Sequence, residues 1–140
     1  MGVDFGERRT GVALSDPTGT LASPLQTIRR RPGQRLPVTA LESLARVHNV
    51  TAIVVGVPLS LRGADTEWTR RVRTAGEELA RRLQVPVGFV DERFTSVQAE
   101  RAIRAAGHTL GEPEHRARVD RVAAAVILQT WLDRRSDEVR

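Results

Sequence analysis

The chain has 140 residues, of which 40% are hydrophobic and 28% charged, a composition typical of a globular protein. This length fits one domain, residues 1–140, with a buried core. The lack of cysteine excludes disulfides, thiolate metal sites and a cysteine nucleophile. Because the sequence has no run of about eighteen apolar residues, we expect no membrane association. Its N-terminus has no basic region followed by an apolar one, so we expect no secretory signal and a cytoplasmic location.

The basic residues are unusual, because all 22 are arginine, and the net charge is +5. Arginine presents a planar fork of donors that matches phosphate, so this charge predicts a nucleic-acid partner. Aromatic residues make up only 4% of the chain and include no tyrosine, so few side chains could stack on bases. We therefore expect contacts with the phosphate backbone to dominate.

Three strands are expected first, because short apolar runs alternate there with turn residues. They cover residues 1–6, 10–15 and 21–28, and the short turns between them predict antiparallel neighbours. Pro24 interrupts the third run, which indicates an edge strand or a bulge.

Helices and strands then alternate, which predicts parallel strands. The fold class is therefore α/β, a mixed five-stranded sheet with helices on both faces. The expected elements are a helix at 37–47, a buried strand at 51–57, a helix at 65–83 capped by Asp65, a buried strand at 85–90, a helix from Thr95 or Ser96 to Ala106, a polar loop at 108–118, a helix at 119–134 and a frayed tail at 136–140.

The first strand carries a carboxylate between two glycines. On a strand, Gly2, Asp4 and Gly6 share one face, while Val3 and Phe5 share the other. The missing side chains would let a metal ion or a phosphate approach Asp4 closely. The alternative is that Asp4 is only a turn residue before Gly6.

Two further acidic positions are candidates for the same site. Asp91 and Glu92 follow a buried strand, where ligands bind in α/β sheets, although a solvated turn explains them equally well. Asp120 lies in the first turn of the last helix, where an acid also suits the helix dipole. A helical projection nevertheless places Asp120 within the apolar arc formed by Val119, Val122, Ala123, Val126, Ile127 and Trp131.

Carboxylates that converge from separate elements repel one another unless a cation lies between them. Oxygen ligands without cysteine or a suitably spaced histidine favour Mg²⁺ or Mn²⁺. Such a site under an arginine-rich surface suits the hydrolysis of phosphodiester bonds, with one metal ion activating water and a second stabilising the leaving oxygen.

Four segments stand out together: Gly-Val-Asp-Phe-Gly at 2–6 with Thr-Gly-Val-Ala-Leu-Ser-Asp at 10–16, Val-Gly-Val-Pro at 55–58 with Gly63, Val-Asp-Glu-Arg-Phe-Thr-Ser at 90–96, and Asp-Arg-Val-Ala-Ala at 120–124. In this order they resemble the YqgF/RuvX family of the RNase H-like superfamily. That resemblance implies an RNase H-like fold and a nuclease with catalytic and metal-binding residues Asp4, Glu92 and Asp120. Members are described as processing the ribosomal RNA precursor of the small subunit, and earlier as Holliday junction resolvases by similarity to RuvC.

The resemblance suggests a role for each acid. Asp4, which lies on the central strand, should bridge two metal ions. Glu92 and Asp120 should each complete the ligand shell of one of these two ions. Asp91 is the rival of Glu92, because the end of the strand decides which of the two faces inward. His115, like His108, lies in the expected polar loop and is not assigned a catalytic role.

Three arginines are candidate nucleic-acid ligands. Arg8 and Arg9 adjoin the Asp4 segment and could hold backbone phosphate, or they could form a solvated turn. Arg93 is either a phosphate contact or an ion-pair partner of the acids.

The sequence departs from the family pattern at two places. Met1 directly precedes Gly2, whereas the family's first strand has a few more residues, so a chain extended upstream should be more stable. Ala117-Arg118 stands where the family often has Lys-Gly, which affects how the chain bends there.

Three other functions remain open. A junction resolvase would need two active sites in a symmetric dimer, so the oligomeric state, monomer or homodimer, separates it from an RNA nuclease. A nucleotide-binding module of the actin-like kind also opens with Asp-x-Gly and a hairpin. A non-catalytic RNA-binding factor could retain the fold.

Overall fold

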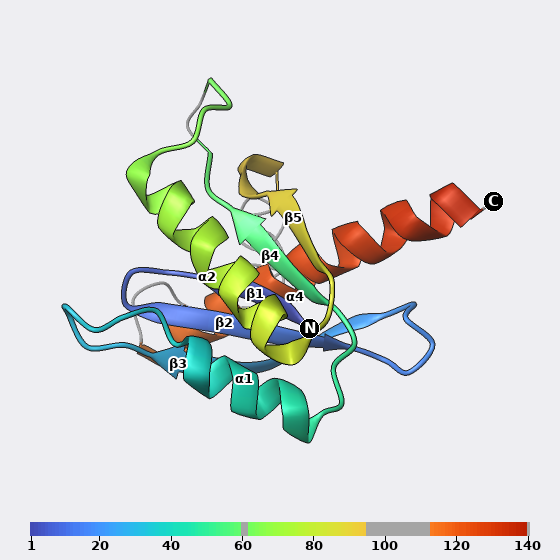
Figure 1. Ribbon diagram of the computed structural model, residues 1–140, viewed down its shortest axis with the longest axis horizontal. Coiled ribbons are helices and arrows are strands. Elements are labelled where there is room, and N and C mark those ends of the chain that lie inside the picture. Colours follow the sequence, from blue (N-terminus) through green and yellow to red (C-terminus); the bar gives the residue numbers. More distant parts are fainter. Residues whose placement is uncertain (60–61, 95–112, 140) are drawn as a thin grey trace.

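The protein forms a five-stranded sheet with helices on both faces (Figure 1). The structure, a computed structural model, describes residues 1–59, 62–94 and 113–139. Its elements are β1 (Gly2–Phe5), β2 (Arg9–Ser15), β3 (Ala22–Arg29), α1 (Val38–Val47), β4 (Ile53–Val57), α2 (Glu67–Leu83), β5 (Val87–Asp91), a 3₁₀ turn (Glu92–Phe94) and α4 (Pro113–Val139).

The sheet has the order β3-β2-β1-β4-β5, which places β1 at its centre. Strands β1, β2 and β3 pair antiparallel, whereas β1, β4 and β5 pair parallel. This confirms the predicted mixed sheet. All five residues of β4 are buried, as expected for a strand covered on both faces.

Pro24 has the predicted consequence, because β3 is an edge strand and carries a bulge. The register shifts where Val12 faces Gln26 but Ala13 faces Pro24, so Leu25 is the extra residue. β5 is the other edge of the sheet, and only Val90 of its five residues is fully buried. The expectation of a buried strand at 85–90 was therefore wrong, since an edge strand has a neighbour on one side only.

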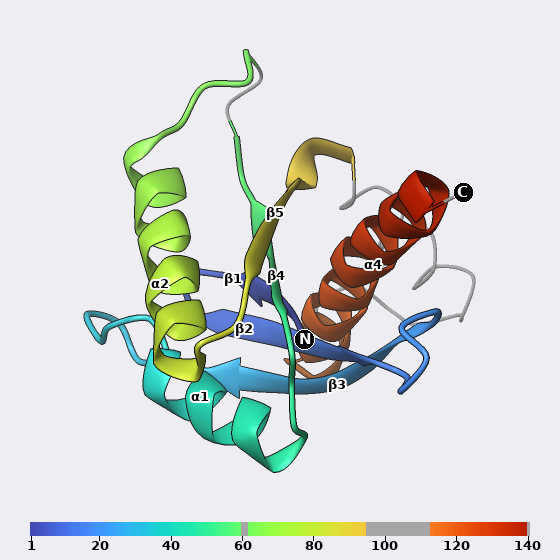
Figure 2. The same ribbon diagram turned by 45° about the vertical axis from the view of Figure 1, so that its right-hand side comes forward.

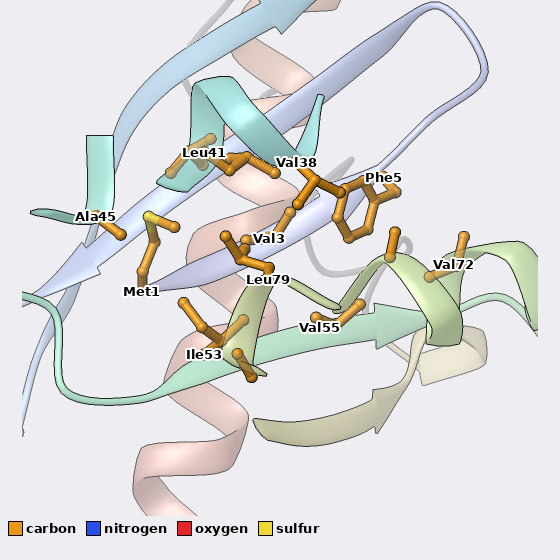
Figure 3. Close-up of a cluster of buried hydrophobic side chains, with 13 residues drawn as sticks. Met1, Val3, Phe5, Val38, Leu41, Ala45, Ile53, Val55, Val72 and Leu79 are labelled. Carbon is orange, nitrogen blue, oxygen red and sulfur yellow. The ribbon is translucent and has the colours of Figure 1, made fainter. Parts of the chain in front are cut away.

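Two apolar layers sandwich the sheet (Figure 2). Helices α1 and α2 cover one face, where Val3 and Phe5 join Leu41, Val55 and Leu79 in the larger core (Figure 3). Helix α4 crosses the other face and contacts all five strands. Its smaller core contains Ala13, Val54, Val90, Ala124, Ala125, Ile127, Leu128 and Leu132.

The start of α2 differs slightly from expectation. Thr66, not Asp65, is the N-cap, because its hydroxyl accepts a hydrogen bond from the Thr69 amide at 3.1 Å. Asp65 instead pairs with Arg73, whose Nε lies 3.0 Å from Oδ2.

The last helix is longer than predicted. α4 begins at Pro113, so the expected loop at 108–118 is helical from residue 113, and the expected frayed tail is helical to residue 139. The helix expected from Thr95 or Ser96 to Ala106 lies outside the described residues. No described helix is long and apolar enough to cross a membrane.

Candidate active site

Asp4 occupies the middle of a row of residues that runs across the sheet beneath α4. It lies opposite Gly11 of β2 in the antiparallel register. The parallel register pairs Val3 with Val55, which places Gly56 of β4 on the other side of Asp4. Asp4 is thus flanked by two residues without side chains, on the face away from the larger core.

These two glycines let neighbouring groups approach Asp4. A Cβ added at Gly11 would overlap the Asp120 carbonyl oxygen in the backbone of α4. One added at Gly56 would lie 2.6 Å from Oε1 of Glu92 and 2.9 Å from its Cγ. Sequence reasoning missed both glycines, although their positions in the strands beside Asp4 were the signal that could have revealed them.

Gly2 and Gly6, the two glycines that sequence reasoning placed beside Asp4, make room for protein atoms. A Cβ at Gly2 would lie 2.7 Å from the Cβ of Leu128, so this position makes room for α4. One at Gly6 would overlap the carbonyl oxygen of Arg9 in the hairpin turn. The expectation that Gly2 and Gly6 clear a space for a metal ion or a phosphate was therefore wrong.

Glu92 is the inward-facing member of the acidic pair. It continues the side-chain alternation of Gly88 and Val90 on the α4 face, directly after β5 ends. Burial, then the hydrogen bond with Asp4 and the nearby negative charges, raises the pKa of Glu92 to about 10. Glu92 is therefore protonated at neutral pH and hydrogen-bonded to Asp4.

Asp91 has a different partner, Arg93. The Arg93 Nη2 and Nε atoms lie 2.6 Å and 2.8 Å from Asp91 Oδ2, and the Arg93 amide donates to Oδ1 at 3.0 Å. The Arg93 guanidinium lowers the pKa of Asp91, against the effect of burial. Of the two roles expected for Arg93, ion-pair partner and phosphate contact, the structure shows the first.

Asp120 approaches the site from α4 and is held by Arg9. The Nε of Arg9 lies 2.6 Å from Oδ2 of Asp120, and the two side chains are 28% and 20% exposed. Burial raises the pKa of Asp120, the Arg9 guanidinium opposes that shift, and the charge of Asp4 adds to it. Sequence reasoning placed Arg9 in a turn, but it begins β2 and projects from the same face as Gly11.

The predicted apolar arc of the last helix was partly wrong. Of its six residues only Ile127 is fully buried, because α4 turns small residues such as Ala124 toward the glycine-bearing strands. Asp120 nevertheless lies along the buried side, three residues after Ala117 and four before Ala124.

The remaining candidates lie as follows. Arg8 is exposed in the hairpin turn, and its carbonyl accepts a hydrogen bond from the Arg30 amide at 2.8 Å. His115 is buried on α4 and not in a polar loop, while His108 lies outside the described residues. Trp131 packs over Gly88, which agrees with a packing role.

The donors at the site suit a hard cation only in part. Asp4 and Glu92 offer oxygen ligands, but Glu92 is protonated at neutral pH, and a carboxylic acid is a weaker ligand for a cation than a carboxylate. Asp120 would be the third ligand, but Arg9 binds its Oδ2. Within residues 1–59, 62–94 and 113–139, no three acidic or histidine side chains are grouped closely enough to hold a metal ion.

A family model described as "RuvX: Holliday junction resolvase" matches residues 1–134. The chain belongs to this RuvX family. Two curated relatives carry the name "Putative pre-16S rRNA nuclease". The relative from Roseiflexus sp. is 45% identical over 95% of this chain and 92% of its own length. The relative from Koribacter versatilis is 41% identical over 96% of this chain and 86% of its own length.

Solved structures confirm the RuvC-like, RNase H-like fold of this RuvX-family chain. RuvC of Thermus thermophilus matches 97% of the chain with a TM-score of 0.55 at 17% identity, covering 95% of RuvC. The same protein in complex with a Holliday junction substrate gives a TM-score of 0.59 over 96% of the chain and 94% of RuvC, again at 17% identity. At this identity the likeness concerns the fold.

Proposed function

We propose that this protein is a divalent-metal-dependent nuclease that processes the RNA precursor of the small ribosomal subunit. The observation that carries the proposal is the hydrogen-bonded pair of carboxyl groups, Asp4 and Glu92, in the sheet of a RuvX-family chain. The names of the relatives at 45% and 41% identity support the substrate. The arginine-rich composition supports a phosphate backbone as the partner.

In this proposal Asp4 and Glu92 are catalytic residues that hold Mg²⁺ or Mn²⁺, and Asp120 completes the ligand set. The bound cation would supply an activated water molecule and stabilise charge on the leaving oxygen. Asp4 lies on the central strand, and Glu92, which is hydrogen-bonded to Asp4, would release its proton to water when its carboxylate binds the cation. Arg8 and Arg93 lie near the ends of the strands that bear the carboxylates and would position the substrate phosphates.

The test is a cleavage panel with the purified full chain. We expect cleavage of a structured precursor RNA of the small subunit in Mg²⁺ or Mn²⁺ and none in EDTA. Unstructured single-stranded RNA serves as the comparison substrate and should be cut more slowly. If no RNA is cut with either metal ion, or if EDTA leaves the rate unchanged, the proposal fails.

A second candidate is cleavage of four-way DNA junctions. The description of the matching family model and the likeness to RuvC bound to a junction favour it. Junction resolution requires two active sites that act together, hence a symmetric dimer. Junction cleavage by a chain that is dimeric in light scattering would support this candidate, and a monomer would argue against it.

A further inference from the structure

Arg9 binds one of the two carboxylate oxygens of Asp120, a proposed metal ligand. Its Nε donates to Oδ2 of Asp120 at 2.6 Å, and this ion pair connects the start of β2 to α4 across 111 residues of sequence. Both side chains are largely sheltered from solvent. A charge-assisted hydrogen bond this short is strong, so Arg9 holds Asp120 in one position.

The backbone around the pair is fixed as well. The Arg9 carbonyl accepts a hydrogen bond from the Gly6 amide at 2.9 Å, which closes the turn that follows the Asp4 strand. Gly11, two residues further along β2, lies against the Asp120 backbone. The same strand therefore contacts both the backbone and the carboxylate of Asp120.

A guanidinium and a divalent cation cannot share this carboxylate at low cost. Two positive groups on one carboxylate lie only a few ångströms apart, and their repulsion is strong in a partly buried site. A cation that binds Asp120 together with Asp4 and Glu92 must therefore compete with the positive charge of Arg9 on the same carboxylate.

We propose that Arg9 is a reversible clamp on Asp120 that competes with the metal ion. Cation binding displaces the guanidinium from Oδ2, and the released Arg9 becomes available to a substrate phosphate beside the site. The inference rests on the proposed function for the identity of the metal site. In this proposal Arg9 is a positioning residue, because it acts through Asp120. Replacing Arg9 should therefore change the affinity of the protein for the metal ion, even without RNA.

The test is Mn²⁺ titration by calorimetry, without RNA, of the wild-type chain, Arg9→Gln and Arg8→Gln. Arg8 is the matched control, because it is the adjacent, exposed arginine and has no ion pair within the described part of the chain. Arg9→Gln should bind Mn²⁺ about fivefold more tightly than wild type, the size expected when a competing ion pair is lost. Arg8→Gln should stay within about twofold, since it removes only a solvated charge.

Two more variants make the result specific to the ion pair. Arg9→Lys keeps the charge without the planar fork and should fall between wild type and Arg9→Gln. In an Asp120→Asn background, Arg9→Gln should give no gain, because there is no carboxylate left to release. If Arg9→Gln fails to fold, the same comparison is made with Arg9→Lys, measured alone and in the Asp120→Asn background.

The outcomes separate this inference from the proposed function. Equal affinities for Arg9→Gln and Arg8→Gln, or weaker binding by Arg9→Gln, overturn the clamp even if the chain cuts RNA. A gain that persists in the Asp120→Asn background also overturns it. The predicted pattern without any RNA cleavage supports the clamp and removes the nuclease assignment, and absence of Mn²⁺ binding overturns both.

Discussion

At the scale of single residues, the site depends on a carboxyl group that stays protonated at neutral pH. Glu92 acquires this property from its position, because it is buried beside a second carboxylate. The sequence identified Glu92 and Asp91 as rivals but could not choose between them, because the choice depends on where β5 ends. With Val90 buried on the α4 face, alternation places Glu92 on that face as well.

The raised pKa of Glu92 predicts how stability changes with pH in EDTA. Its pKa is about 10 in the folded chain against an ordinary value of 4.5. Between these pH values the folded state binds a proton that the unfolded state lacks, so stability falls as pH rises. Glu92→Gln has no such proton, so its melting temperature relative to wild type should rise by on the order of ten degrees between pH 5 and pH 8.

Glu77→Gln is the control for this experiment, because Glu77 is exposed on α2. Its melting temperature should follow that of wild type at both pH values. A constant difference between Glu92→Gln and wild type from pH 5 to pH 8 would show that Glu92 titrates normally.

At the scale of elements, the fit of α4 against the sheet brings Asp120 to Asp4. The sequence predicted this helix but started it at Val119, because Pro113 and the polar residues after it resemble a loop. Proline is favoured in the first turn of a helix, where its missing N–H costs nothing, so Pro113 is a start signal here. The close approach at Gly11 could not be predicted without the register that places it opposite Asp4.

Gly11→Ala tests this close approach. The added Cβ would overlap the Asp120 carbonyl, a backbone atom that cannot rotate away, so α4 would have to shift. We expect a loss of roughly 1–3 kcal/mol in the free energy of unfolding, measured by urea denaturation. Mn²⁺ affinity should also fall, because the shift moves Asp120.

Gly76→Ala is the matched control on the opposite face of the sheet. Its Cβ would lie 2.8 Å from Cγ2 of Val55, a side-chain atom, and alanine is the better helix former. We expect a smaller loss of stability and an unchanged Mn²⁺ affinity. Equal losses for the two variants would contradict the view that α4 must lie directly on Gly11.

At the scale of the whole molecule, the mixed sheet could be predicted from the sequence, because it depends on element order, while the arginine-rich composition leaves a polyanion partner as a prediction. Individual side-chain partners could not be. Arg9 and Asp120 are 111 residues apart, and only the packing of α4 on β2 brings them together. The resemblance to a family pointed to three acids, but the hydrogen bond between two of them and the ion pair of the third with Arg9 depend on burial and distance.

The central claim is that Asp4 and Glu92 form the catalytic centre of a metal-dependent RNA nuclease. The most direct test is the rate of Mn²⁺-dependent cleavage of the structured precursor RNA by Asp4→Asn, compared with Asp65→Asn, which changes an exposed aspartate paired with Arg73. Asparagine keeps the shape of Asp4 but lacks the charge that holds a cation. We expect Asp4→Asn to lose at least about a hundredfold in rate and Asp65→Asn to match wild type. Cleavage by folded Asp4→Asn at the wild-type rate would contradict the account.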